Sequence, residues 1–522
     1  MIDTRLAIRV EAPIGTISPR LYGHFAEHLG RCCYDGLWVG PQERTIPQQD
    51  GFRTDVLQAL RALPVPMLRW PGGCYADHYH WRDGIGPSGQ RPIRLGLSCG
   101  LQVEDDNSLG TDEFLRFCAR LGAEPYLAGN VGSGTPQELC DWVEYCNSAV
   151  RTTLARERAA NGSAAPYDVK LWGVGNENWG CGGNYDAVAY AEEYRRYATM
   201  LRHVDPTIEL VACGVEEPNM FAEGFPTDWN AKLLATLGRH LSGPNGQRGL
   251  IDHLSIHTYW IHGGPEVEFS EAEYYRLLAE ADAMERNVIH TADVIGDATG
   301  GRSHIGIAFD EWGVWHPEAR EWGPHGEVVS RSPVTYEQAN TLRDALAAGI
   351  ALEGFHRQCS VLSLANLAQI VNVLQAVVMT EGNRLWLTPT YHALRLHAPH
   401  LGATAVPVVI DQGASLPGGG PMVSATASRT AGGLAITLIN RHYSQEASVT
   451  IAGSGGYDRA SGQILNADSP RAVNSADEPD RVAPAKLEVA RDGSNLWRVE
   501  LPPHSLATIV MAPTAAMGES AE

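Results

Sequence analysis

Long apolar runs and an excess of basic residues are both missing from this 522-residue chain. No run reaches the ~18 consecutive apolar residues that a membrane-spanning helix needs, so we expect no membrane contact. Lys and Arg number 40 against 61 Asp and Glu, which gives a formal net charge of -21. This charge would repel a polyanion, so the composition argues against nucleic acid and favours a soluble protein with an uncharged substrate.

An export signal and a cysteine framework are also missing. Residues 1–7 contain neither the basic segment nor the apolar segment of a signal peptide. Ten cysteines are scattered along the chain, and none belongs to a CxxC motif. Since disulfides persist mainly in exported proteins, we expect reduced thiols and a cytoplasmic location.

Short apolar segments alternate with longer amphipathic stretches in the first two thirds of the chain. The expected strands cover residues 21–24, 67–71, 125–128, 169–177, 208–213, 251–257, 304–311 and 359–365. Helical periodicity between them predicts an α/β fold, a parallel (β/α)8 barrel. An open doubly wound sheet is the alternative, but no GxGxxG follows the first strand and no Walker motif is present.

The pattern changes after about Leu385, where apolar and polar residues begin to alternate. Residues 434–438, 447–451 and 497–501 show this period of two, and glycine-rich breaks separate them. The alternation predicts a jelly-roll-like antiparallel β-sandwich. We therefore expect a catalytic barrel over residues 21–384 and a sandwich domain built from residues 1–20 and 385–522.

Carboxylates and tryptophans gather where two expected strands end. The fourth strand ends in Asn176-Glu177, and the seventh ends in Asp310-Glu311-Trp312. Catalytic groups of (β/α)8 barrels come from the C-terminal ends of strands. Neither a GxSxG nucleophile elbow nor a phosphate-binding loop is present. Paired carboxylates beside aromatic rings suit a carbohydrate, whose ring faces stack on Trp.

Two such carboxylates are sufficient to break a glycosidic bond. In a retaining enzyme, a carboxylic acid protonates the leaving oxygen while a carboxylate about 5–5.5 Å away attacks the sugar. Glu177 is the candidate acid/base, and Glu311 is the candidate nucleophile. Glu177 would then activate water in the second step. No metal or cofactor is required.

Three other interpretations remain open at this point. His24, Glu27 and His28 form an H-x-x-E-H pattern, which in a helix can bind zinc. Cys74 could be a nucleophilic thiol with His257 or His78 as its base. The chain could also bind carbohydrate without hydrolysing it, in which case Glu311→Ala would change no hydrolysis.

Several segments together resemble glycoside hydrolase family 51, the α-L-arabinofuranosidases of clan A. They span residues 22–373 in family order. The segments are Tyr22-Gly23-His24-Phe25-Ala26-Glu27-His28-Leu29-Gly30-Arg31, Leu68-Arg69-Trp70-Pro71-Gly72-Gly73, Gly175-Asn176-Glu177-Asn178-Trp179-Gly180-Cys181-Gly182-Gly183, Ala308-Phe309-Asp310-Glu311-Trp312-Gly313-Val314-Trp315 and Ala368-Gln369-Ile370-Val371-Asn372-Val373.

The resemblance implies a role for each matching residue. Glu177 is implied as acid/base and Glu311 as nucleophile, with Tyr259 hydrogen-bonded to the nucleophile. The implied substrate-binding residues are Glu27, Cys74, Asn176, Trp179, Tyr259, Trp315 and Gln369. Asn176 would bind the sugar 2-hydroxyl, and Glu27 and Gln369 would bind other furanose hydroxyls. Many members have Asn where this chain has Cys74.

The resemblance also implies a substrate and an assembly. The expected substrate is an arabinofuranose-containing oligosaccharide from arabinan or arabinoxylan, cleaved by an exo-acting, retaining enzyme. A galactofuranosidase, β-xylosidase or β-1,4-glucanase is the alternative within the same class. Family members are commonly homo-oligomers, and a hexamer is implied here.

Overall fold

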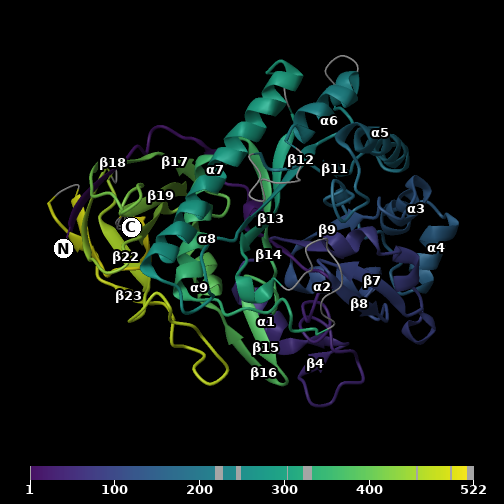
Figure 1. The fold of residues 1–522 in the computed structure, drawn as a ribbon, viewed down its shortest axis with the longest axis horizontal. Coiled ribbons are helices and arrows are strands. Elements are labelled where there is room, and N and C mark those ends of the chain that lie inside the picture. The colour runs from purple at the N-terminus through teal and green to yellow at the C-terminus, as the bar shows by residue number, and fades with distance from the viewer. Residues whose placement is uncertain are drawn as a thin grey trace, which may run out of the picture.

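The computed structural model describes residues 2–217, 227–242, 248–301, 304–320, 332–453, 456–493 and 496–513. Figure 1 shows a barrel surrounded by helices beside a sandwich of strands from the last part of the chain. Both labelled termini lie at the sandwich, so the chain starts there, builds the barrel and returns.

Eight parallel strands close into a barrel, as the sequence predicts. The first strand pairs with the last, which completes the ring. In chain order they are β3 (Gly23–Phe25), β6 (Met67–Trp70), β9 (Glu124–Gly129), β10 (Leu171–Val174), β11 (Glu209–Ala212), β12 (His253–Trp260), β13 (Gly306–Val314) and β14 (Leu362–Ala368).

Helices cover the outside of this barrel. They are α1 (Thr54–Ala62), α2 (Thr111–Leu121), α3 (Pro136–Asn147), α4 (Thr153–Ala160), α5 (Ala187–Val204), α6 (Trp229–Leu237), α7 (Glu271–Thr299) and α8 (Leu342–Arg357). In the described part of the chain, no helix combines the length and apolarity needed to cross a membrane.

Helix α5 shows how local sequence fixes a strand end near the barrel mouth. Asp186 caps the helix by accepting hydrogen bonds from the N–H groups of Val188 and Ala189. One turn into the helix, the buried Tyr190 hydroxyl donates to the carbonyl of Val174, the last residue of β10, at 2.6 Å. The segment that carries Glu177 therefore leaves the barrel from an anchored point.

The barrel interior is filled by side chains, so it has no pore. Six buried residues from six of the eight barrel strands form this plug: Met67, Tyr126, Leu171, Val211, Ala308 and Leu364. Burying each large apolar side chain stabilises the fold by about 1.5–3 kcal/mol. The plug fills the barrel below the strand ends, and the catalytic groups of such barrels lie above it, at the mouth.

The sandwich consists of two packed sheets. One has the order β18 (Val408–Gln412), β1 (Ile2–Ile8), β21 (Ala447–Ala452), β25 (Leu496–Leu501), β24 (Ala490–Arg491). The other has the order β2 (Gly15–Thr16), β17 (Thr404–Val406), β19 (Val423–Thr430), β20 (Gly433–Asn440), β26 (Ser505–Ala512), β22 (Arg459–Leu465), β23 (Ala485–Leu487). Leu6, Val449 and Ile436 belong to the apolar core between them.

The N-terminal strand joins the sandwich as expected, but it pairs in parallel with β21 and so interrupts the otherwise antiparallel pairing. Helix α9 (Pro389–His397) was not predicted, because the sequence pattern after Leu385 indicates strands only. Thr388 caps this helix and Pro389 is its first residue, which is a favourable helix start that the alternating pattern downstream obscured. The exact domain boundaries stay a prediction.

Candidate active site

Glu311 lies inside β13, and an irregularity in the strand positions it. Ile256 on β12 pairs with Phe309, whereas His257 pairs with Glu311, so Asp310 is an extra residue between the two pairs. Such a bulge re-aims the following side chain. Asp310 accepts hydrogen bonds inside the barrel, including one from the Tyr126 hydroxyl at 2.6 Å.

The carboxylate of Glu311 is buried and held by three groups. Arg69 donates to Oε1 at 2.8 Å, and the Tyr259 hydroxyl donates to Oε2 at 2.8 Å. His257 Nδ1 lies 3.7 Å from Oε2. Burial alone would raise the pKa of Glu311, but the positive charges of His257 and Arg69 and these hydrogen bonds lower it. Glu311 is therefore held as a charged carboxylate.

Glu177 lies beyond the end of β10, in a turn and not on the strand that the sequence predicts. Its φ is +42°, a left-handed conformation that is uncommon outside glycine. Its carbonyl accepts hydrogen bonds from the N–H groups of Gly180 and Gly182, at 2.7 and 3.3 Å. The turn directs the carboxylate toward the barrel mouth, where Oε1 is 2.8 Å from His257 Nδ1.

His257 connects the two carboxylates. Burial by itself would lower the pKa of this imidazole, but the negative charges of Glu311 and Glu177 raise it to about 9. One oxygen of Glu177, one of Glu311 and one ring nitrogen of His257 all lie within 4.8 Å of one another. Two carboxylates at this spacing can act on opposite sides of one bond.

Glu27 and Gln369 form a second part of the site. Glu27 accepts from the N–H of Gly73 and Tyr75, each at 3.1 Å, and from the Ser98 hydroxyl at 2.7 Å. Gln369 donates to its other oxygen at 2.9 Å. Burial and the charge of Glu311 raise the pKa of Glu27 to about 7, although these hydrogen bonds oppose that rise.

Two buried amide atoms point to a ligand. Asn176 accepts a hydrogen bond from Arg69 at 2.5 Å through its side-chain oxygen. No described residue hydrogen-bonds Asn176 Nδ2 or Gln369 Oε1, although both atoms are buried. A buried polar atom without a partner is costly, so a bound molecule with hydroxyl groups would satisfy both.

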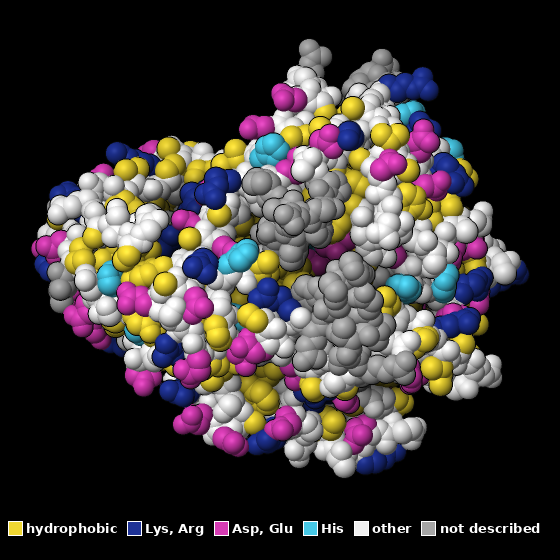
Figure 2. Space-filling model, in the orientation of Figure 1, with side chains coloured by type: hydrophobic (Ala, Val, Ile, Leu, Met, Phe, Trp, Pro, Cys, Tyr) yellow, Lys and Arg dark blue, Asp and Glu magenta, His cyan; other side chains and the backbone are white. Residues whose placement is uncertain are grey.

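Aromatic rings and glycines shape the walls. Trp315 packs edge-on against Tyr259, with ring centroids 5.0 Å apart. Trp179, which is half-buried, donates to the carbonyl of Gly214 at 3.2 Å. A Cβ at Gly73 would lie 2.8 Å from Glu311 Oε1, so only glycine fits beside that carboxylate. Figure 2 shows acidic side chains within a hollow near the middle of one face.

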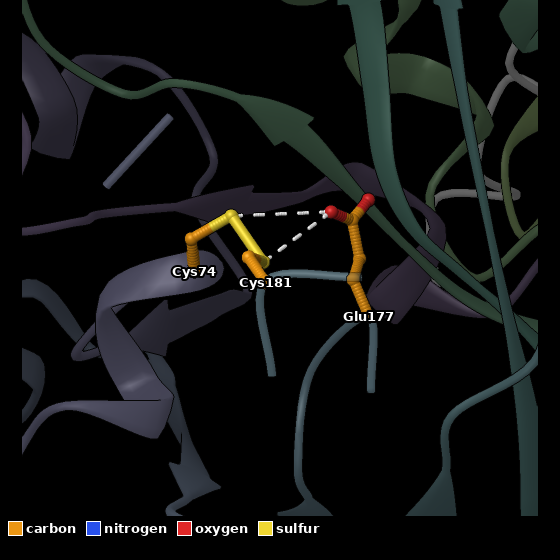
Figure 3. Close-up of side chains that lie close together, drawn as sticks. All are labelled: Cys74, Glu177 and Cys181. Atoms are coloured by element: carbon orange, nitrogen blue, oxygen red, sulfur yellow. Dashed lines mark hydrogen bonds between the residues drawn. A yellow bond between two sulfur atoms is a disulfide. The ribbon is translucent and has the colours of Figure 1, made fainter. Parts of the chain in front are cut away.

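Cys74 forms a disulfide with Cys181, which corrects the expectation of reduced thiols throughout. Cys74 follows β6 and Cys181 follows β10, and both strands end at the barrel mouth. The two cysteines are 107 residues apart in sequence, so their spacing gave no sign of pairing. Figure 3 shows both sulfurs facing the Glu177 carboxylate, at 4.0 and 3.8 Å from Oε2.

The alternative chemistries do not fit this geometry. The His28 ring accepts from the Trp70 indole at 3.1 Å, and Glu27 faces backbone N–H groups. Within the described ranges, neither His24 nor His28 joins a cluster of three potential metal ligands. Cys74 is in a disulfide, and His257 bonds to Glu177, so the thiol–imidazole pair is also not formed.

The sequence interpretation did not predict that two residues, Arg69 and His257, hold the candidate catalytic carboxylates. Arg69 is a cation in the middle of a buried strand, and such a residue needs a carboxylate partner. A charged residue in an otherwise apolar strand could therefore have been recognised in the sequence as the partner of a carboxylate. His257 ends an expected strand, so its position at the mouth was readable, but its position between two carboxylates depends on the register of β12 against β13.

Comparisons with known proteins identify the family. The model of the α-L-arabinofuranosidase 1 domain matches residues 59–258, and that of the α-L-arabinofuranosidase C-terminal domain matches residues 310–505. An intracellular exo-α-L-arabinofuranosidase of Bacteroides ovatus is 38% identical over 94% of this chain and 92% of its own length.

Solved structures agree over the whole chain. The GH51 arabinofuranosidase from Xanthomonas axonopodis pv. citri has a TM-score of 0.87 and 34% identity, and the match covers 98% of this chain and 100% of that one. An α-L-arabinofuranosidase from Thermotoga maritima, solved as an arabinose complex, has a TM-score of 0.83 and 30% identity with the same coverage.

The barrel and its facing carboxylates define a glycoside hydrolase. The length and the sequence identity of these matches also identify the family within that class. This chain belongs to glycoside hydrolase family 51, the α-L-arabinofuranosidases.

Proposed function

We propose that this chain is a retaining, exo-acting α-L-arabinofuranosidase that releases terminal arabinofuranose from arabinan- or arabinoxylan-derived oligosaccharides. The observation that carries the mechanism is the approach of Glu177 and Glu311, whose nearest oxygens lie within 4.8 Å. Retaining enzymes hold their carboxyl groups about 5–5.5 Å apart, whereas inverting enzymes leave about 6.5–9.5 Å for a water. The sugar and the exo action follow the names of the relatives.

Glu311 attacks the anomeric carbon in the first step, and Glu177 donates its proton to the leaving oxygen. Glu311 reacts as a carboxylate, because Arg69 and Tyr259 hold both of its oxygens. A glycosyl–Glu311 ester results. In the second step Glu177, now ionised, takes a proton from water, and the water displaces Glu311 from the sugar.

The remaining residues bind the arabinofuranosyl ring. Asn176 Nδ2 donates to the 2-hydroxyl, and Gln369 Oε1 and Glu27 take other ring hydroxyls. The buried, unpartnered amide atoms among the described residues support this assignment. Trp179 and Trp315 line the pocket, and Cys74 contacts the sugar through its disulfide sulfur.

A panel of 4-nitrophenyl glycosides tests the sugar, and proton NMR tests the stereochemistry. We expect turnover of the α-L-arabinofuranoside at least about a hundredfold faster than that of the β-D-galactofuranoside, β-D-xyloside and β-D-cellobioside. The first sugar formed should be the α anomer. An inert arabinofuranoside beside an active second glycoside would refute the specificity, and a β anomer first would refute retention. Glu311→Ala, prepared identically, controls for contaminating hydrolases.

The relatives also suggest where this protein is located and how it assembles. We propose an intracellular enzyme, because the Bacteroides ovatus relative is named intracellular. We also propose a homo-oligomer, a hexamer by family resemblance. The neighbouring apolar side chains of Ile93 and Leu95 are 73% and 61% exposed and offer a contact surface. Light scattering after gel filtration tests this, and a particle of 56.5 kDa would contradict it.

A further inference from the structure

The short helix η2 (Cys74–Asp77) contacts the turn that carries Glu177 through both of its ends. Its first residue forms the disulfide with Cys181, which follows Glu177 in the same turn (Figure 3). Its last residue, Asp77, accepts a hydrogen bond through Oδ2 from the N–H of Asn176, at 3.1 Å. Asn176 directly precedes Glu177 in the chain. The proposed hydrolysis gives Asp77 no role.

Asp77 also holds a third loop. Its Oδ1 accepts hydrogen bonds from the N–H groups of Val131 and Gly132, at 2.8 and 2.7 Å, in the loop after β9. The residue is only 3% exposed, and burial raises its pKa to about 7, although these hydrogen bonds oppose that rise. Because a buried carboxylate is costly, the main-chain donors compensate its burial. One side chain therefore joins the loops that follow β6, β9 and β10.

Two glycines allow the Asp77 carboxylate to approach both neighbouring loops. A Cβ at Gly132 would lie 2.9 Å from Asp77 Cβ, and a Cβ at Gly182 would lie 2.4 Å from Asp77 Oδ2. Side chains do not fit at such separations, so glycine is needed at both positions. Asp77 therefore packs directly against the turn on both sides of Glu177, at residues 176 and 182.

The backbone of Glu177 needs such support. Its φ of +42° is a left-handed conformation, which a residue other than glycine keeps only where the surrounding structure holds it. The residue directly before it is held twice. Asp77 binds the main-chain N–H of Asn176, and Arg69 donates to the side-chain oxygen of Asn176. Loss of the first contact would free the main chain where the turn begins.

We propose that Asp77 is a positioning residue for the acid/base, which fixes the turn that aims Glu177 at the leaving oxygen. The inference rests on the acid/base role proposed for Glu177. Asp77 acts through the N–H of Asn176 and not on the sugar. Proton donation depends on geometry, and a misplacement of about 1 Å can lower a rate by about 10²-fold. Loss of Asp77 should therefore impair proton donation more than the attack by Glu311.

Asp77→Asn is the decisive variant, because it keeps the shape of the side chain. Either orientation of the new amide places an NH2 group against a main-chain N–H. We expect kcat/KM for methyl α-L-arabinofuranoside, a poor leaving group, to fall about 10–10²-fold. The loss for the dinitrophenyl glycoside should be at least about tenfold smaller, because dinitrophenolate leaves without a proton. Any displacement of Asn176 lowers both rates equally, so their ratio isolates Glu177. Equal losses would overturn the inference.

Asp112→Asn is the matched control. Asp112 lies in the outer helix α2, is 2% exposed and accepts hydrogen bonds from the Tyr145 and Tyr167 hydroxyls. Its variant should keep the parent's ratio of rates, and a changed ratio there would mean that the ratio reports general loosening of the fold, which contradicts the assignment of Asp77.

Gly132→Ala reaches the same contact from the neighbouring loop without changing a charge. Its new methyl group should displace Asp77, so we expect the ratio of rates to change in the same direction as in Asp77→Asn. Circular dichroism must show that each variant is folded. An unchanged ratio in folded Gly132→Ala would count against the inference. If neither variant folds, the role of Asp77 is structural and the inference fails.

Combination with Glu177→Ala separates this inference from the proposed function. In that background Asp77→Asn should add no further loss that depends on the leaving group, and an added selective loss would refute the coupling. Equal losses for both leaving groups in Glu177→Ala alone would refute the acid/base role itself. A selective Glu177→Ala beside an unselective Asp77→Asn would refute only the positioning role.

Hydrogen exchange followed by mass spectrometry gives a measurement that needs no activity. In Asp77→Asn, the peptide that contains Asn176 and Glu177 should exchange at least about tenfold faster than in the parent, while peptides from the sandwich exchange as before. The same peptide should be unchanged in Asp112→Asn. Parent-like exchange of this peptide in Asp77→Asn would show that Asp77 does not hold the turn, whatever the enzyme hydrolyses.

Discussion

Glu311 and Glu177 are the same residue type in opposite surroundings. Glu311 lies within a nine-residue strand, its side chain is 7% exposed, and Arg69 and Tyr259 hold its oxygens. Glu177 lies in a left-handed turn past a strand end, its side chain is 20% exposed, and one of its oxygens faces two sulfurs.

The difference matches the two proposed tasks. A nucleophile should stay charged and aimed at one carbon, which a rigid strand and fixed hydrogen bonds provide. A group that gives a proton in one step and takes one in the next needs access to water and to the leaving group. The strand therefore supplies precision for Glu311, and the turn supplies access for Glu177.

The largest expected effect is on the Glu311 side of this comparison. Glu311→Ala should lower kcat by about 10⁴-fold or more, because no other group can form the ester. Initial rates with 4-nitrophenyl α-L-arabinofuranoside measure this. Circular dichroism must show that the variant is folded, since Arg69 loses a buried partner. Glu488→Ala, on the sandwich surface, is the control and should keep full activity. A loss below about tenfold would contradict the nucleophile assignment.

Glu177→Ala should give a smaller and more selective loss. Poor leaving groups need the proton, so we expect their kcat/KM to fall about 10²–10⁴-fold, whereas a dinitrophenyl leaving group should retain most of its first-step rate. Azide should then accelerate turnover by attacking the glycosyl-enzyme. Equal losses for good and poor leaving groups, with no azide effect, would show that Glu177 does not act as acid/base.

The order of helices and strands was predictable, because the spacing of apolar residues along the chain indicates it. All eight barrel strands were placed from apolar segments. Both glutamates were expected at strand ends, whereas Glu177 lies in the turn after β10 and Glu311 lies inside β13. Helix α4 was not anticipated, since its apolar face is weak: only Leu154, Ala155 and Arg158 are buried.

Contacts between distant segments were not predictable. The Cys74–Cys181 bond joins loops of two strands, and no local pattern encodes it. The bulge that leaves Asp310 unpaired depends on the register of β12 against β13, and it decides that His257 faces Glu311. Motifs therefore identified the reacting groups, and only the packed barrel located the groups that tune them.

His257 lies between the two carboxylates, and its protonation makes the stability of the fold depend on pH. Its pKa of about 9 in the folded protein is above the ordinary value of 6.5. The folded state therefore binds this proton more tightly, and the resulting stability is fully present below pH 6.5 and is lost as pH rises through 9. Its size is on the order of 3 kcal/mol.

Denaturant melts of the parent and His257→Asn measure this contribution. The stability difference between them should be largest near pH 6 and should shrink toward pH 9.5. His203→Asn, at an exposed position of α5, is the control and should change stability little at either pH. A stability difference that grows with pH would mean that His257 is neutral in the folded protein, and the two carboxylates would then lack their shared cation.

Tyr259→Phe should have the smallest of these effects on activity. It tests whether the function of the rigidly held Glu311 depends on a single hydrogen bond. The variant removes the 2.8 Å bond to Glu311 Oε2 and leaves Arg69 on Oε1. A hydrogen bond to a charged group contributes about 1.5–3 kcal/mol, so kcat/KM should fall about 10–10²-fold. Tyr275→Phe, on the outer helix α7, is the matched control. Because Tyr259 contacts the ester-forming group and not the leaving group, the loss should be equal for good and poor leaving groups, unlike that of Glu177→Ala. A leaving-group-dependent loss would place Tyr259 on the proton-transfer side instead.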